Sequence, residues 1–370
     1  MKLRYKILNG VLGMLVLALV LLGVVLSYDA DCGPAPEAQA DVETMQAIVA
    51  RCYGSPEVLE LTDVAKPVPG DDDVLVRVMA AGVNPLDWHY MRGSPYFMRL
   101  GTGIGAPDDV RTGVDFAGVV EAVGKDVTKF RPGDEVFGGA GGAFAEYVVV
   151  GEDRAIVRKP GNISFAEAAA VPIAAITALQ ALRDHGRVGA GDRVLVNGAS
   201  GGVGTYAVQI AGTLGAEVSG VCSTRNVELV RSLGAHRVFD YTKENYTEGD
   251  AEFDVIIDNV GNHSLVANTR VMSSDGRFVI VGAQQGDWIR PLLRPLAAMV
   301  VAPFVDQEIG MFIAALRQDD LAYLAGLLES GEIRSVIDRR YTIADAAEAM
   351  RYSESGRARG KIVITVGAAD

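Results

Sequence analysis

A glycine-rich turn offers the clearest chemistry in this chain. Residues 193–215 begin with an apolar run of β type, pass through Gly198, Gly201, Gly202 and Gly204, and then continue with apolar side chains at helical spacing. A turn without side chains lets the backbone approach a pyrophosphate, and the start of the following helix favours an anion. The spacing GxxGxxG differs from the usual GxGxxG. The motif alone leaves two alternatives open: a dinucleotide cradle, or a tight strand-to-helix turn that binds nothing.

The end of the next expected strand bears on which dinucleotide would bind. An acidic side chain about twenty residues past the turn would hydrogen-bond a ribose 2′-hydroxyl and favour NAD. The chain has Ser223, Thr224 and Arg225 there instead. Hydroxyls and a guanidinium hold a 2′-phosphate by charge-assisted hydrogen bonds, so these residues predict NADPH as the cofactor. The alternatives are a solvated Arg225 and a helix-capping role for the two hydroxyls, and capping is compatible with phosphate binding.

The segments that must position these residues alternate between strand and helix patterns. A helix is expected over 164–184, then strands over 217–223, 237–241, 253–259 and 277–282, with helices over 226–234 and 263–272. This alternation predicts an α/β domain with a parallel, doubly wound sheet and ligands at the carboxyl ends of its strands. Asn259 and Gly282 end two of these strands and belong to the predicted cofactor site.

The preceding region has a different pattern. From about Met45 to Lys159, short β-like runs alternate with turn signals, which is typical of a small irregular barrel. A further helix is expected over 320–330, and a last strand over 361–366 is placed to rejoin the barrel. Residues 292–305 are strongly apolar, but Pro295 and Pro303 argue against a membrane span. A pocket lining, a dimer contact and a bilayer contact all remain open for this segment.

Composition limits the possible partners. The chain has 370 residues, 49% of them apolar, which is enough for two domains. Its net charge of −13 argues against nucleic acid and anionic membranes as electrostatic partners. Cys32, Cys52 and Cys222 are odd in number and lack CxxC spacing, so no disulfide framework is expected. The four histidines form no metal-spaced cluster, and no zinc site is predicted.

The N-terminus carries a candidate membrane anchor. Basic residues precede an apolar run over 11–26, whose length just spans a bilayer, and no small-residue cleavage site directly follows it. We therefore expect an uncleaved single-pass anchor and a short linker over 32–41. The basic residues, with Asp29 and Asp31 after the run, predict a cytoplasmic N-terminus and an external body. A nicotinamide cofactor favours a cytoplasmic body instead, so the topology remains open.

Five motifs in one order resemble those of a known family. They are NPLD at 84–87, GVDFAG at 113–118, RPGDEV at 131–136, GAFAEY at 142–147 and the glycine turn at 197–204. Together they resemble the medium-chain dehydrogenase/reductase superfamily, specifically its zinc-independent quinone oxidoreductase branch and the relatives of the mitochondrial reticulon-interacting oxidoreductase. The resemblance covers roughly residues 45–366.

The resemblance implies a domain organisation. It implies a GroES-like β-barrel domain over 45–165, completed by about 335–370, and a Rossmann NADP-binding domain over 166–334, preceded by the transmembrane helix and linker at 1–40. Cofactor and substrate would occupy the cleft between the domains, and hydride transfer would start from a nicotinamide, often within a homodimer. Asn84 and Val114 occupy positions where zinc-dependent members have cysteine and histidine. Neither replaces a zinc ligand, so a reaction without metal is expected.

The resemblance also assigns site residues. Ser200, Gly201, Gly202 and Val203 would lie along the pyrophosphate, with Ser223 and Tyr241 also at the cofactor. Tyr241 would pack on the adenine side or remain a boundary tyrosine with its hydroxyl in water.

Hydride acceptors gain negative charge on oxygen, so catalysis needs donors near that oxygen. The loop at 84–93 supplies the candidates. Asn84 would position the nicotinamide or donate to the carbonyl, His89 and Tyr90 would supply a proton, and Asp87 would orient one of them. The structural alternatives are a turn cap for Asp87 and a surface position for His89.

Three functions follow. The first is NADPH-dependent reduction of quinones or α,β-unsaturated carbonyl compounds, with a small lipophilic substrate beside the membrane. The second is reduction of enoyl thioesters. The third is a noncatalytic NADPH-binding or membrane-associated protein.

Overall fold

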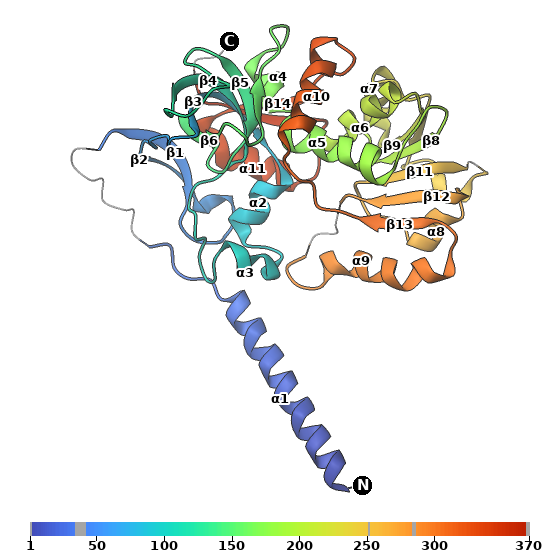
Figure 1. The fold of residues 1–370 in the computed structure, drawn as a ribbon. Coiled ribbons are helices and arrows are strands. Elements are labelled where there is room, and N and C mark those ends of the chain that lie inside the picture. Colours follow the sequence, from blue (N-terminus) through green and yellow to red (C-terminus); the bar gives the residue numbers. More distant parts are fainter. Residues whose placement is uncertain (1, 34–41, 251, 283–285, 368–370) are drawn as a thin grey trace.

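The computed structural model describes residues 2–33, 42–250, 252–282 and 286–367. Two domains lie side by side, and helix α1 (Lys2–Ser27) projects from the body on the side where α3 (Arg99–Thr102) and α9 (Arg290–Val301) lie (Figure 1). Most of the expected linker, residues 34–41, falls outside the described residues.

One domain is built on a six-stranded parallel sheet. Its strands are β8 (Arg193–Asn197), β9 (Glu217–Cys222), β10 (Arg237–Asp240), β11 (Phe253–Asp258), β12 (Met272–Ile280) and β13 (Glu308–Met311). Their spatial order is β10-β9-β8-β11-β12-β13, so the chain reverses direction across the sheet between β8 and β11. In open α/β sheets, ligands bind at this switch point, outside the carboxyl ends of the strands.

Helices cover this sheet. They are α6 (Gly202–Thr213), α7 (Val227–Ser232), α8 (Leu265–Thr269) and α9, with α5 (Pro172–Gln180) packed against α6 and α10 (Gln318–Glu329) against α5. The short helix α4 (Phe165–Ala169) packs on strands of the other domain instead. The main core joins alanines and leucines of α5, α6 and α10 to Val194 and Val196 of β8. The single helix expected over 164–184 is divided into α4, α5 and a π-helical turn (Ala181–His185). Pro172 causes the division because it lacks the N–H that a continuous helix requires and instead starts α5.

The other domain is the barrel. Its strands are β3 (Asp73–Val83), β4 (Asp115–Val123), β5 (Glu135–Gly139), β6 (Tyr147–Gly151), β7 (Ile156–Arg158), β14 (Ile337–Thr342) and β15 (Lys361–Thr365), with β1 (Thr44–Ala50) and β2 (Leu59–Ala65) as a separate pair. Helices α2 (Pro85–Arg92), α3 and α11 (Ala346–Glu354) accompany them. The last strand, β15, pairs antiparallel with β3, so the chain returns to the barrel at its end. The expected barrel and doubly wound parallel sheet are therefore both present.

Helix α1 forms where an apolar helix was expected. Across the described part of the chain, however, no helix is both long and apolar enough to cross a membrane. The predicted single-pass anchor is therefore not supported.

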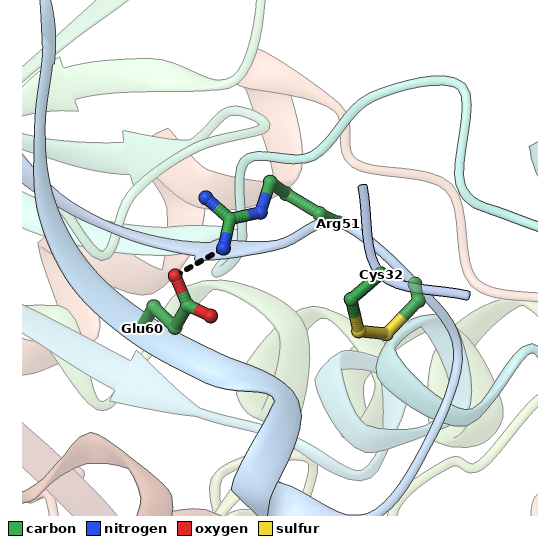
Figure 2. The surroundings of a disulfide bond; sticks show 4 residues. Cys32, Arg51 and Glu60 are labelled. Atoms are coloured by element: carbon green, nitrogen blue, oxygen red, sulfur yellow. Dashed lines mark hydrogen bonds and ion pairs between the residues drawn. A yellow bond between two sulfur atoms is a disulfide. The ribbon is translucent and has the colours of Figure 1, made fainter. Parts of the chain in front are cut away.

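A disulfide corrects the expectation drawn from the cysteines. Cys32 and Cys52 are bonded, with their Cα atoms 4.8 Å apart, and Figure 2 shows the bond beside the Arg51–Glu60 ion pair. The chain after α1 folds back against the end of β1. The spacing of cysteines in the sequence does not predict this tertiary contact. Cys222 is free and buried.

Candidate functional site

A cavity of about 1000 Å³ lies between the domains, at the switch point of the Rossmann sheet. The glycine turn after β8, the ends of β9 and β11, the start of α2 and the start of β15 all line it. We call it the interdomain cavity. Its wall therefore combines residues that the sequence separates by more than 250 positions.

The glycine turn is shaped for close approach of a ligand to the backbone. Gly198 has a φ of 82°, in the left-handed region. A Cβ on Gly204 would collide with the carbonyl oxygen of Gly198, so only glycine permits this tight turn. Helix α6 begins at Gly202 with no side chain capping it. Its first N–H groups therefore remain available for an anion, as a pyrophosphate cradle requires.

Two orphaned amide oxygens in the cavity wall also fit a dinucleotide. The Oδ1 atoms of Asn226 and Asn259 are buried and have no hydrogen-bond partner among the described residues. Asn226 donates through Nδ2 to Ser200 Oγ at 2.9 Å, which links the glycine turn to the end of β9. Asn259 donates through Nδ2 to Asn197 O at 2.9 Å. Both oxygens can accept from hydroxyl or amide groups of a bound dinucleotide, so the residues present fit the cofactor.

The predicted 2′-phosphate residues lie in the cavity wall. Ser223, Thr224, Arg225 and Tyr241 all line it, together with Arg357. Arg225 Nη2 donates to Arg357 O at 3.0 Å, so a second guanidinium-bearing residue lies beside Arg225. The Thr224 hydroxyl donates to Asp240 Oδ2 at 2.6 Å, so its proton is already engaged. Neither hydroxyl caps a helix here.

The cavity wall also includes part of a buried cluster of four polar side chains: Asn84, Asp87, Asp115 and Lys361. Lys361 Nζ donates to Asn84 Oδ1 and lies 3.5 Å from Asp115 Oδ2. Asn84 Nδ2 donates to Asp115 Oδ2 at 2.9 Å. Asp87 Oδ2 accepts from the Asn84 N–H at 2.7 Å and so completes a capping box at the start of α2. Asn84 and Lys361 line the cavity, whereas both aspartates lie behind it.

Burial dominates the electrostatics of this cluster. It raises the pKa of Asp87 to about 7, with the charge of Asp115 adding to the rise and the hydrogen bond from the Asn84 N–H opposing it. Burial likewise raises the pKa of Asp115, against the attraction of Lys361. Burial lowers the pKa of Lys361, against the attraction of the two carboxylates. Two acids and one ammonium thus share a site that excludes water, which makes their protonation sensitive to any change in the cavity.

The structure separates the predicted catalytic residues. Asn84 reaches the cavity, but its amide is already engaged with Lys361 and Asp115. His89 and Tyr90 are not among the residues that line the cavity. The Nδ1 atom of His89 is 2.6 Å from Ser94 O, and burial lowers the pKa of its ring. The helical phase of α2 explains the difference, because the N-cap and the N3 residue face inward while the following residues turn away.

The cofactor prediction agrees better with the cavity. Gly198, Ser200, Gly201, Gly202, Val203, Gly204 and Asn259 all line it. Gly282 does not. A Cβ on Gly282 would overlap Asn259 O, so Gly282 supports the strand end beside the cavity. Sequence reasoning missed Lys361 and Asp115. A lysine opening an apolar strand, and an aspartate inside the GVDFAG motif, were the available signals. The described residues contain no cluster of three or more metal-ligating side chains, and a metal-free reaction stays a prediction.

Comparisons with known proteins agree with the two-domain fold. Residues 70–161 match the model of the alcohol dehydrogenase GroES-like domain, and residues 233–364 match that of the zinc-binding dehydrogenases. A quinone oxidoreductase of Sus scrofa is 35% identical over 336 residues, which cover 86% of this chain and 97% of that protein. A 2-methylene-furan-3-one reductase of Solanum lycopersicum is 35% identical over 329 residues, covering 84% and 76%. The structure of the quinone oxidoreductase from Coxiella burnetii has a TM-score of 0.77 at 29% identity, covering 88% of this chain and 100% of that one.

Proposed function

Because the chain belongs to the quinone oxidoreductase branch of the medium-chain dehydrogenase/reductase superfamily, we propose that it reduces quinones or α,β-unsaturated carbonyl compounds with NADPH. The observation that carries the proposal is the interdomain cavity. One continuous cavity is lined by the glycine turn, by Arg225 and Arg357, and by Asn84 and Lys361 of the buried cluster. An extended dinucleotide with a reactive ring fits that distribution of polar groups.

Different residues of the chain bind different parts of the cofactor. The backbone N–H groups at the start of α6 hold the pyrophosphate, and the amide oxygens of Asn226 and Asn259 accept from the cofactor's hydroxyl or amide donors. Arg225 and Arg357 hold the 2′-phosphate, since guanidinium groups bind phosphate by paired charge-assisted hydrogen bonds. NADPH, when bound, supplies a hydride from its nicotinamide ring.

Lys361, in place of His89 and Tyr90, is the proposed side chain that contacts the substrate oxygen. Its ammonium group has three hydrogens, and the structure shows two acceptors for them, Asn84 Oδ1 and Asp115 Oδ2. The remaining hydrogen is available to a carbonyl or quinone oxygen in the cavity that Lys361 lines. A cation buried beside this oxygen would stabilise the negative charge that develops there. Asn84 and Asp115 are positioning residues that hold the ammonium group.

Small lipophilic quinones and enones are the proposed substrates. The homodimer that the resemblance implies stays a prediction, which sedimentation velocity can test by measuring the mass of the protein in solution. The activity test uses the full-length protein with NADPH or NADH and a panel of quinones, enals and enoyl-CoA. We expect turnover of quinones or enals with NADPH preferred over NADH. Saturation of enoyl-CoA alone would favour the thioester reductase. Tight NADPH binding without oxidation by any acceptor would favour the noncatalytic protein.

A further inference from the structure

After its exposed first residue, Arg290, helix α9 turns its one other charged side chain inward and its apolar side chains outward. Arg294 is buried, donates to His263 O at 3.1 Å and forms an ion pair with Asp258 at the end of β11. The outward face carries only apolar side chains from Leu292 to Val300, among them Met299 at 74% and Val300 at 67% exposure. A helix on a water-facing surface normally has the opposite polarity. The outward face of α9 is therefore built for an apolar environment.

The described part of α1 shows the same preference on every side. Its leucine, valine and methionine side chains between Leu12 and Val25 are 45–67% exposed, and they occupy successive positions around the helix. A partner protein could cover one stripe of such a helix. Covering the whole circumference requires a surrounding medium, and hydrocarbon is the medium that accepts an apolar helix on all sides. Contact of α1 with hydrocarbon does not require a crossing, and no described helix is long and apolar enough to cross a membrane.

A buried arginine mounts the root of α1 rigidly on the body. Arg99, just after the Tyr96–Met98 turn, donates through Nη1 to Leu26 O at 3.0 Å and to Tyr28 O at 2.9 Å. It also forms an ion pair with Asp29 at 2.8 Å. A cation is favourable at a helix C-terminus, where the last carbonyl groups lack partners. The Cys32–Cys52 disulfide adds a covalent tie a few residues further on. The two domains therefore keep a fixed orientation relative to the axis of α1.

The two apolar elements are joined by aromatic contacts at the root of α1. Trp288, directly before α9, lies against Gly23 of α1 and meets Tyr96 edge-on, with ring centroids 4.8 Å apart. The exposed side chains of Phe97, Leu100 and Ile104 continue the apolar surface around that root. Trp288 and Tyr28 are themselves half-exposed there. Tryptophan and tyrosine are enriched where a protein meets the boundary of a bilayer.

We propose that this base, formed by α9, the 97–104 segment and the root of α1, docks on the surface of a lipid bilayer, with the outward side chains of α9 in the lipid interface. In Figure 1, α1 leaves the body on the side where α3 and α9 lie, so a single lipid surface can contact all three. The net charge of −13 disfavours attraction to anionic lipids. Docking therefore rests on apolar burial and requires no anionic headgroup.

The test uses the full-length protein with phosphatidylcholine vesicles. Co-flotation reports association, and quenching of tryptophan fluorescence by lipids with a nitroxide at carbon 5 of the acyl chain reports the depth of Trp288. The Trp288→Phe variant, at an exposed position, identifies the quenched signal as that of Trp288. We expect co-flotation, strong quenching, and no gain in binding when phosphatidylglycerol is added.

A pair of matched variants tests whether the outward face of α9 contacts the lipid. Met299→Glu places a carboxylate on α9, and Val68→Glu places one at an 86% exposed position in the β2–β3 loop. Burial of a methionine side chain is worth roughly 1.5 kcal/mol or more, so Met299→Glu should lower the docked-to-undocked ratio about tenfold. Val68→Glu should leave it unchanged.

Three results would overturn the proposal. They are failure to float, flotation without quenching of Trp288, and equal quenching in the two glutamate variants. A lipid-free dimer that Met299→Glu dissociates would assign the base to a second copy of the chain instead.

Discussion

Replacing Lys361 with methionine removes the cation from the buried cluster and leaves its polar partners in place. Lys361 is 3% exposed, and its Nζ lies 3.5 Å from Asp115 Oδ2. At an effective dielectric constant of 20, two charges at this separation interact by about 5 kcal/mol. Removing one member of a buried pair typically costs about 3–5 kcal/mol, because the remaining charge lacks compensation. We expect Lys361→Met to lower the free energy of unfolding by that amount at pH 7.

A double-mutant cycle shows whether the pair itself is responsible. Asp115→Asn removes the facing charge, while the amide oxygen can still accept from the Ile173 N–H, which lies 3.1 Å from Asp115 Oδ1. The double variant should therefore be more stable than Lys361→Met alone, with a coupling energy of about 2 kcal/mol or more. The assay is urea denaturation followed by circular dichroism. Effects that add within about 0.5 kcal/mol would show that the two groups are not coupled and would refute the account of the cluster.

The remaining predictions concern the cofactor, the pH and the thiols. Arg225→Ala should raise the Kd of NADPH at least tenfold and leave that of NADH unchanged, whereas Arg231→Ala, at an exposed arginine paired with Glu228, should change neither in calorimetric titrations. Gly204→Ala should weaken NADPH binding at least tenfold because the added Cβ displaces the turn; an unchanged Kd would contradict the cradle. Burial raises the pKa of Asp87 to about 7 in the folded protein. The protonated native form is therefore fully favoured below pH 4, and the free energy of unfolding should fall as the pH rises from 4 to 7, by up to about 4 kcal/mol. Asp87→Asn should flatten this slope in denaturation series, and an unchanged slope would assign it to other groups. Without reductant, thiol titration of the denatured protein should find one thiol, Cys222, and three would contradict the disulfide.

Local chemistry explains what the sequence predicted well. The glycine turn and the Ser223–Arg225 segment are contiguous, and the alternation of strands and helices fixes the sheet edge to which both belong. Their meeting at one cavity therefore followed from pattern and topology. The NPLD motif predicted Asn84 as a site residue. The direction of its amide could not be predicted, because it is set by Lys361 and Asp115, which are distant in the sequence.

Long-range packing explains what sequence reasoning missed. Lys361 meets Asn84 across 277 positions, a contact made only when β15 pairs with β3. The predicted proton donors His89 and Tyr90 lie on α2, whose rotation is set by the capping box between Asn84 and Asp87. Residues 292–305 were correctly seen as apolar, but the fact that their apolar side faces outward depends on the ion pair between Arg294 and Asp258.

The proposed reaction is hydride transfer from NADPH to an unsaturated carbonyl compound or quinone. The most direct measurement follows deuterium from C4 of labelled NADPH into the product of an α,β-unsaturated aldehyde, by mass spectrometry and NMR, with the full-length protein. We predict one deuterium at the β-carbon of the saturated product, and loss of this product in Lys361→Met. Reduced product without deuterium, or no product from any enal or quinone despite bound NADPH, would contradict the claim.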